Sequence, residues 1–211
     1  MPVAAADLSS FEMNGRTYTV PAADGFCDIS DSDLVARALG RSGGQKLRRY
    51  IEPKVFQIDC SAVGRLDDPA ILDDLRLRVW GVLARDGREW PATGQQLLQF
   101  ELLRGLFQSM QNPDKRDLRR AFLDKILEGA GERAVKPSCV DMAATESAVG
   151  GKLCMERFAE DRPASGDVAG TVRIVNGRFL TAIAVQLPSF GFGWPSFDDT
   201  EAMLDDVRAA E

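Results

Sequence analysis

The residues that could carry chemistry in this chain are carboxylates, lysines, hydroxyls and thiols, because its 211 residues include no histidine. A Ser-His-Asp or Cys-His relay needs an imidazole that titrates near neutral pH, and the usual zinc sites need at least one imidazole ligand. These sites cannot be built from this sequence. What remains is chemistry by carboxylates, lysine or thiolate, or a binding function without chemistry.

The stretch 145–152 contains the residue types of a serine-lysine site, with Glu146 and Ser147 close to Lys152. It also has the ingredients of a phosphate-binding loop. However, Leu153 follows Lys152 where the Walker motif requires Ser or Thr, and no glycine stands at the required offset. We therefore interpret the stretch as a flexible loop enclosed by a disulfide between the third and fourth cysteines.

Adjacent aspartates occur at several places, and those at 67–68, 73–74 and 198–199 are candidates for chemistry. A pair of carboxylates can act as acid and base or bind a hard cation. Aspartates at the start of a helix also interact favourably with the helix dipole, and this is the interpretation we prefer. We expect no metal and no cofactor. A small histidine-free hydrolase or lyase, using the 145–152 residues or carboxylates such as Asp67 and Asp73, is the alternative to a non-catalytic protein.

The four cysteines, Cys27, Cys60, Cys139 and Cys154, predict two disulfides. No C-x-x-C pair exists, so an all-thiolate zinc site does not fit their spacing. Of the three possible connectivities, we favour the sequential one, Cys27 with Cys60 and Cys139 with Cys154, because it closes short loops within separate structural units. Four buried free thiols in a cytosolic protein are the alternative.

Two disulfides indicate an oxidising compartment, so we expect a periplasmic or secreted protein. Segment 3–7, VAAAD, resembles the small-residue end of a signal peptide, which we presume has been removed. Apolar runs such as 181–187 are far shorter than the roughly 18 residues that a transmembrane helix needs. A net charge of −6 argues against nucleic acid as a partner, because phosphates must be neutralised by surplus Lys and Arg.

Three turns of one kind predict antiparallel hairpins: Asn14-Gly15, Asp86-Gly87 and Asn176-Gly177. Asn-Gly and Asp-Gly supply the two positive φ angles of a type I′ turn. Residues 54–60 read as a further strand, which would bring its last residue, Cys60, near Cys27.

Helices are predicted over 30–40, 93–110, 112–128 and from Ser196 onward. Thr93 and Gln96 form a T-x-x-Q capping box for the second of these helices. Its apolar residues repeat at helical spacing: Leu98, Leu102, Leu103, Leu106, Phe107 and Met110.

We therefore predict an α+β fold, in which a helical hairpin and a C-terminal helix pack on an antiparallel sheet built from hairpins. Residues 1–10 would form a flexible N-terminal tail. Residues 11–211 would form a single α+β domain, with the helical hairpin at 93–129 as an insertion.

The two ends of the chain carry a resemblance to a known fold. Residues 171–208 read as a long hairpin, a loop and a final amphipathic helix, and residues 18–26 read as a strand that runs into an aromatic turn. Together they resemble the PsbP-like fold, whose members are mostly non-enzymatic binding or assembly proteins. The resemblance implies a binding function, and the 93–129 hairpin would be an insertion relative to that fold.

Two segments could recognise a partner. The segment 187–195 places Phe190, Phe192 and Trp194 among glycines and prolines, where they either anchor a partner or fold back on the core. The predicted helix 112–128 carries a basic face that consists of Lys115, Arg116, Arg119 and Arg120. That face could bind an acidic protein or anionic lipid, or it could simply be solvated and balanced by neighbouring aspartates.

From these features we predict an exported, disulfide-stabilised, non-catalytic binding protein. An inhibitor, an immunity protein or an assembly factor would fit. It would recognise a protein partner through the aromatic segment Phe190 to Trp194, with help from Arg116, Arg119 and Arg120.

Overall fold

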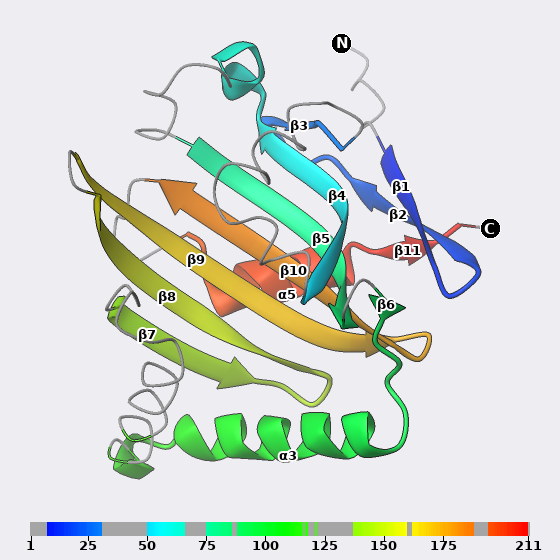
Figure 1. Ribbon diagram of the computed structural model, residues 1–211, viewed down its shortest axis with the longest axis vertical. Helices are drawn as coiled ribbons and strands as arrows, with labels where there is room; N and C mark the ends of the chain where they lie inside the picture. Colours follow the sequence, from blue (N-terminus) through cyan, green and yellow to red (C-terminus); the bar gives the residue numbers. More distant parts are fainter. Residues whose placement is uncertain are drawn as a thin grey trace.

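A large antiparallel sheet organises the chain, and the predicted α+β class is confirmed (Figure 1). The computed structural model describes residues 8–30, 50–65, 75–85, 88–115, 117, 121, 137–159, 162–187 and 194–210. Within these ranges the large sheet has eight strands in the order β3-β4-β5-β10-β9-β8-β7, with β6 paired to β5. A second sheet has the order β1-β2-β11.

The strands of the large sheet are β3 (Phe26–Asp28), β4 (Ile51–Asp59), β5 (Leu75–Arg85), β6 (Arg88–Glu89), β7 (Pro137–Ala144), β8 (Ala148–Ala159), β9 (Arg162–Val175) and β10 (Arg178–Leu187). Those of the small sheet are β1 (Leu8–Met13), β2 (Arg16–Pro21) and β11 (Arg208–Ala209). The helices are α3 (Gln95–Met110) and α5 (Phe197–Asp205), with short 3-10 turns η1 (Cys60–Arg65) and η3 (Pro113–Lys115).

The predicted hairpins are present. Asn14 and Gly15 have φ angles of 50° and 73°, and Asn176 and Gly177 have 46° and 70°, as type I′ turns require. These turns join β1 to β2 and β9 to β10. Residues 86–87 lie outside the described ranges, but the pairing of Arg85 with Arg88 shows that β5 and β6 also form an antiparallel pair.

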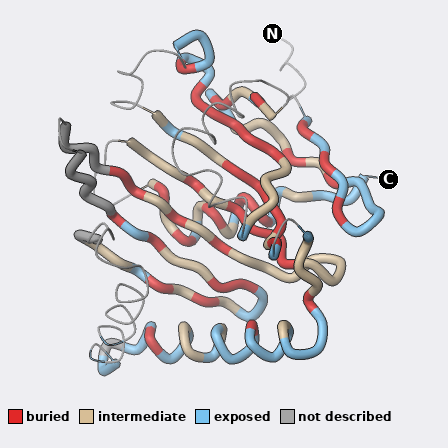
Figure 2. Tube along the Cα trace, in the orientation of Figure 1, coloured by how far each residue is buried: buried red, intermediate tan, exposed pale blue. Residues whose placement is uncertain are grey.

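The central strands are buried on both faces, which we call the α5 face and the α3 face after the helices that cover them (Figure 2). On β10, Phe179 belongs to the α3 face and its neighbour Leu180 to the α5 face. The α5 face also packs against the small sheet through Phe11 and Tyr18.

Helix α5 begins at the predicted Ser196. The Ser196 hydroxyl accepts a hydrogen bond from the Asp199 backbone N–H at 3.2 Å, and the Asp199 carboxylate accepts one from the Ser196 N–H at 2.8 Å. This reciprocal capping box fixes the start of the helix. Met203 and Leu204 are buried on the sheet, and Trp80 Nε1 donates to the Met203 carbonyl at 3.0 Å.

Both disulfides form with the predicted connectivity, and none of the four cysteines is free. Cys27 lies on β3 and Cys60 immediately follows β4, with Cα atoms 4.9 Å apart. Cys139 and Cys154 are directly opposite on β7 and β8, with Cα atoms 4.8 Å apart. Each disulfide therefore ties one of the two outermost described strands of the large sheet to its neighbour.

Three expectations differ from the structure. The predicted capping box of α3 is wrong, because Gly94 is the N-cap with φ 54° and no side chain caps the helix. The stretch 145–152 is largely strand, since β8 begins at Ala148 and continues the ladder with β7 and β9. Strand β1 begins at Leu8, inside the segment expected to be a tail.

The predicted helix 30–40 lies almost entirely outside the described residues, as does most of 112–128. Within the described part of the chain, no helix combines the length and the apolar character needed to cross a membrane.

A pair of glycine variants tests the packing of β8. A Cβ added at Gly150 would lie 2.1 Å from the Gly170 carbonyl oxygen and 2.8 Å from the Thr171 Cα, so the backbone of β9 would have to move. We expect Gly150→Ala to lower the free energy of unfolding by roughly 1–3 kcal/mol. Gly105→Ala, in the middle of α3 with nothing within 4 Å of the new Cβ, should raise it by about 1 kcal/mol.

Urea denaturation followed by circular dichroism measures both changes. A Gly150→Ala variant as stable as the original chain would show that β8 and β9 do not approach each other so closely.

Candidate functional site

Of the residues predicted to bind a partner, Trp194 is described, and it lies half-buried against the core around Trp80. Its ring centre is 6.2 Å from that of Phe26. Trp194 therefore takes the second of the two roles considered for the aromatic segment, folding back on the core. The other predicted contacts lie outside the described residues: Phe190, Phe192, Arg116, Arg119 and Arg120.

The structure does not bring the predicted serine-lysine residues together. Glu146 and Ser147 are exposed in the turn before β8, whereas Lys152 is buried in the strand with its ammonium 3.5 Å from the Asp167 carboxylate. Because a strand rises roughly 3.3 Å per residue, Ser147 and Lys152 are about 16 Å apart.

The predicted carboxylates give no more support to catalysis. Asp67 and Asp73 lie outside the described ranges, and Asp199 is occupied in the helix cap of α5. Among the described residues there is no group of three or more potential metal ligands.

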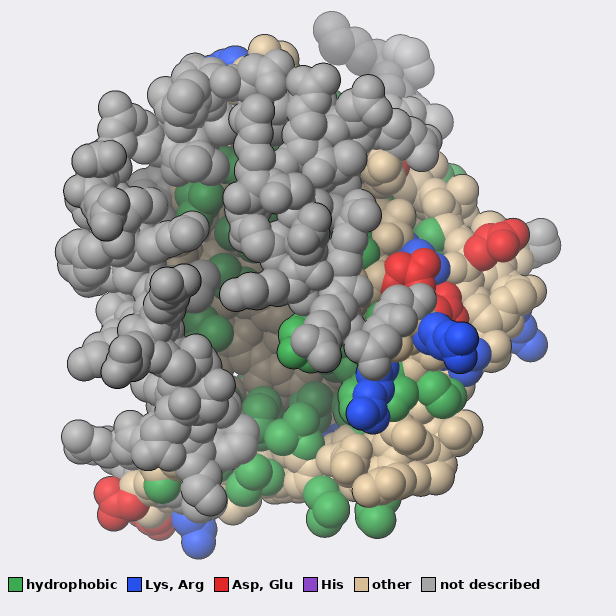
Figure 3. All heavy atoms as spheres, in the orientation of Figure 1, with side chains coloured by type: hydrophobic (Ala, Val, Ile, Leu, Met, Phe, Trp, Pro, Cys, Tyr) green, Lys and Arg blue, Asp and Glu red, His purple; other side chains and the backbone are tan. Residues whose placement is uncertain are grey.

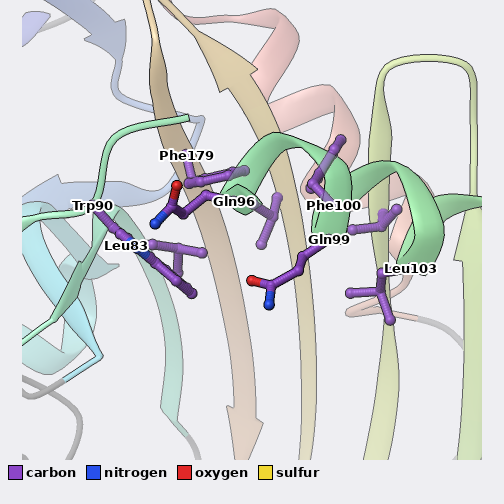
Figure 4. Close-up of a pocket in the computed structure, with 9 residues that line it drawn as sticks. Leu83, Trp90, Gln96, Gln99, Phe100, Leu103 and Phe179 are labelled. Atoms are coloured by element: carbon purple, nitrogen blue, oxygen red, sulfur yellow. The ribbon is translucent and has the colours of Figure 1, made fainter. Parts of the chain in front are cut away.

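The structure shows instead an apolar pocket of about 180 Å³ between α3 and the α3 face of the sheet (Figure 4). Four strands supply its floor, through Leu83, Phe179, Val172 and Val149. Helix α3 contributes a second wall of four residues, and Trp90, which follows β6, closes one end. The residues from α3 are Gln96, Gln99, Phe100 and Leu103.

Aromatic contacts hold these walls together. The ring centres of Phe100 and Trp90 lie 5.6 and 5.9 Å from that of Phe179, within the range of favourable tilted pairs. At the other end of α3, the Gln108 side-chain amide donates to the Thr145 carbonyl in the β7–β8 turn at 3.2 Å. The helix is thus fixed to the sheet at both ends of its inner face.

Exposed leucines also lie on α3, together with the Glu101–Arg104 ion pair. Leu97, Leu98, Leu102 and Leu103 are 40, 60, 66 and 36% exposed, and we call these four residues the leucine face. Figure 3 shows hydrophobic side chains lining a hollow on this side of the molecule and gathering along the lower margin, where α3 runs. Leu103 belongs both to the leucine face and to the pocket wall.

A basic rim adjoins the pocket. Trp90 also lines a shallow depression of about 490 Å³, together with Arg85, Arg88, Glu89 and Pro91. Arg85 and Arg88 are exposed and directly opposite each other in the β5–β6 pair. In the described part of the chain, neither arginine forms an ion pair.

Glu89, the one carboxylate among the described residues that line this depression, is already neutralised. Glu89 lies 3.1 Å from the Lys54 ammonium and 3.1 Å from the Arg178 guanidinium. Burial lowers the pKa of Lys54, but the hydrogen bonds and charges of Glu52 and Glu89 raise it by more, so its pKa lies above the ordinary 10.5. Lys54 is therefore charged at neutral pH.

Two arginines of β5 lie on the α5 face near Trp194. The guanidinium carbons of Arg76 and Arg78 are 5.2 and 5.4 Å from the ring centre of Phe26. Arg76 also binds Asp59, with N–H groups at 3.1 and 2.5 Å from its carboxylate oxygens. The buried Nε of Arg78, by contrast, has no hydrogen-bond partner among the described residues.

Aromatic rings and more distant carboxylates stabilise the positive charge of Arg78. Burial lowers the pKa of Arg78, and the charges of Asp206 and Asp199 act in the opposite direction. Its guanidinium also lies 5.3 Å from the Trp80 ring centre, a favourable cation–π distance.

No protein-family model matches this sequence, and no curated protein matches it either. The PsbP-like resemblance therefore stays a prediction.

The two arginines should differ in their effect on stability. Arg76→Met leaves the mostly buried Asp59 without its charged partner, so we expect the free energy of unfolding to fall by about 1–3 kcal/mol. Arg78→Met removes two cation–π contacts but also an unpaired buried donor, and we expect a change below about 1 kcal/mol. Urea denaturation of both variants at pH 7 provides the comparison. Equal losses would contradict the assignment of Asp59 to Arg76.

Proposed function

We propose that this chain is an exported, disulfide-stabilised binding protein without catalytic activity, and that it recognises a protein partner. The leucine face beside the apolar pocket is the observation that carries the proposal. Single exposed leucines are common on protein surfaces, but four on one helix next to an open pocket are a concentration of exposed apolar side chains, and exposed apolar patches typically mark an interaction site.

The arrangement has the parts of a binding hot spot. A pocket lined by aromatic and aliphatic side chains can take an anchoring side chain of the partner, while the surrounding leucines exclude water. Full burial of one exposed leucine contributes roughly 1.5–3 kcal/mol. The leucine face could therefore supply several kcal/mol to an interface.

Two disulfides and no free cysteine support export, because such bonds persist in oxidising compartments. An inhibitor, an immunity protein or an assembly factor would meet its partner there. We propose the leucine face of α3 as the main contact surface, and the segment Phe190 to Phe192 stays a predicted second contact. A hydrolase gains no support, because Lys152 pairs with Asp167 away from the exposed Glu146 and Ser147, and the described residues hold no group of three or more potential metal ligands.

Substitution of the leucine face tests the proposal. We expect Leu98→Gln/Leu102→Gln to weaken capture of a partner from the extracellular or periplasmic fraction of the source cells at least tenfold, because two anchoring leucines are lost. Leu8→Gln is the matched control, since Leu8 is 65% exposed but lies on β1 of the small sheet. Quantitative mass spectrometry of proteins bound to the immobilised chain measures the effect.

Equal capture by the leucine-face variant and by Leu8→Gln would overturn the proposal. The free energy of unfolding provides a second criterion, and we expect both variants to stay within about 0.5 kcal/mol of the original chain. A loss above about 1.5 kcal/mol in Leu98→Gln/Leu102→Gln alone would mean that other residues of this chain cover these leucines.

If the protein is exported, all four of its cysteines should be oxidised to disulfides in the source cells. We expect the protein isolated from its source cells to add no alkylating groups before reduction and four after it, with peptide mapping recovering Cys27–Cys60 and Cys139–Cys154. Intact-mass spectrometry distinguishes the two states. Four thiols that react without reductant would place the protein in a reducing compartment and remove the argument for export.

A further inference from the structure

The basic rim gives the leucine face and its pocket a chemical preference. We infer that the group bound here is a segment of the partner protein in which a large apolar side chain stands next to a carboxylate. This inference rests on the proposed function, because it names the chemistry of the contact that the pocket would receive.

The pocket determines the size and the apolar character of the side chain that this group can insert. A cavity of about 150 Å³ lined by Leu, Ile and Phe side chains binds benzene, so 180 Å³ of similar lining suits a phenyl ring or a branched aliphatic side chain. The pocket residues carry no charge, and Gln96 and Gln99 are their polar members. A charged side chain would lose its hydration here without gaining an ion pair.

The basic rim determines the charged part of the bound group, which we infer to be a carboxylate. Like charges directly opposite in an antiparallel pair destabilise it, and Arg85 and Arg88 face each other without a counter-ion among the described residues. Counting Lys54 and Arg178 as well, the described residues here include four cations and two carboxylates, Glu52 and Glu89. This local excess of positive charge stands in a chain whose net charge is −6.

Trp90 connects the apolar and the charged parts of the site, because it lines both the pocket and the depression that contains the arginines. A ligand group whose ring enters the pocket therefore has its next few atoms beside the basic rim. A phenylalanine or leucine that is C-terminal, or that is followed by Asp or Glu, has a carboxylate within that reach. Charge complementarity of this kind raises the specificity and the association rate of an interface.

Two small probes separate the contributions. N-acetylphenylalanine carries the ring and the carboxylate, and N-acetylphenylalaninamide carries the ring alone. Their affinities can be measured from the shift of the Trp90 indole N–H in ¹H–¹⁵N spectra of the full chain. The buried Trp80 serves as an internal reference.

We expect both probes to shift Trp90, with the carboxylate bound about two- to fivefold more tightly at low salt. The variant Arg85→Gln/Arg88→Gln should lose this preference and keep its affinity for the amide, because the pocket itself is unchanged. Raising the salt concentration should reduce the preference in the original chain.

Equal affinities for the two probes in the original chain would overturn the carboxylate inference and leave the proposed protein binding intact. Failure of both probes to shift Trp90 would overturn the pocket as an anchor site, while the capture experiment with the leucine face would still decide the proposed function. Hexanoate bound more than tenfold more tightly than N-acetylphenylalanine would identify a free carboxylic acid as the occupant and overturn the partner segment.

Discussion

The burial of Trp80 is the interaction on which the arrangement of the layers depends. Its side chain has no exposed surface, and its Nε1 donates to the Met203 carbonyl of α5 at 3.0 Å. A buried N–H without a partner costs about 1–3 kcal/mol, so α5 must lie where this carbonyl meets the indole. On the neighbouring strand Ala182 is opposite Trp80, and its small side chain leaves the space that the ring occupies. The α5 face is therefore closed by the chain's own residues.

The α3 face is closed less completely, and the difference lies in the helix. Helix α3 turns Phe100 and Met110 inward, yet Leu98 and Leu102 lie on its outer side. The helix also carries polar residues such as the Glu101–Arg104 ion pair, so it is not apolar all round, but its exposed leucines are more than a fully solvated face needs. With one side on the sheet and the other exposed, α3 keeps an apolar surface that folding has not used. Burial of this surface would contribute several kcal/mol to an interface, as one part of the free energy that must offset the entropy lost on association.

Much of the fold follows from local signals in the sequence. The turns Asn14-Gly15 and Asn176-Gly177 need positive φ angles, and the Ser196 cap meets its partner three residues later, so these elements were predictable. The capping box at Thr93 failed because Gly94 takes the N-cap position.

The site could not be predicted in the same way. Helical periodicity identifies the apolar residues of α3, but it does not say whether a stripe contacts the core or a partner. Figure 2 shows that most of α3 is exposed. The pocket combines residues from four strands and one helix, an assembly that depends on the sheet order. Each disulfide fixes an outer strand of the large sheet to the neighbouring strand. The disulfide between Cys139 and Cys154 fixes β7, the strand against which α3 packs. A surface held on a fixed strand loses little conformational freedom on binding, so more of its apolar burial is retained as affinity.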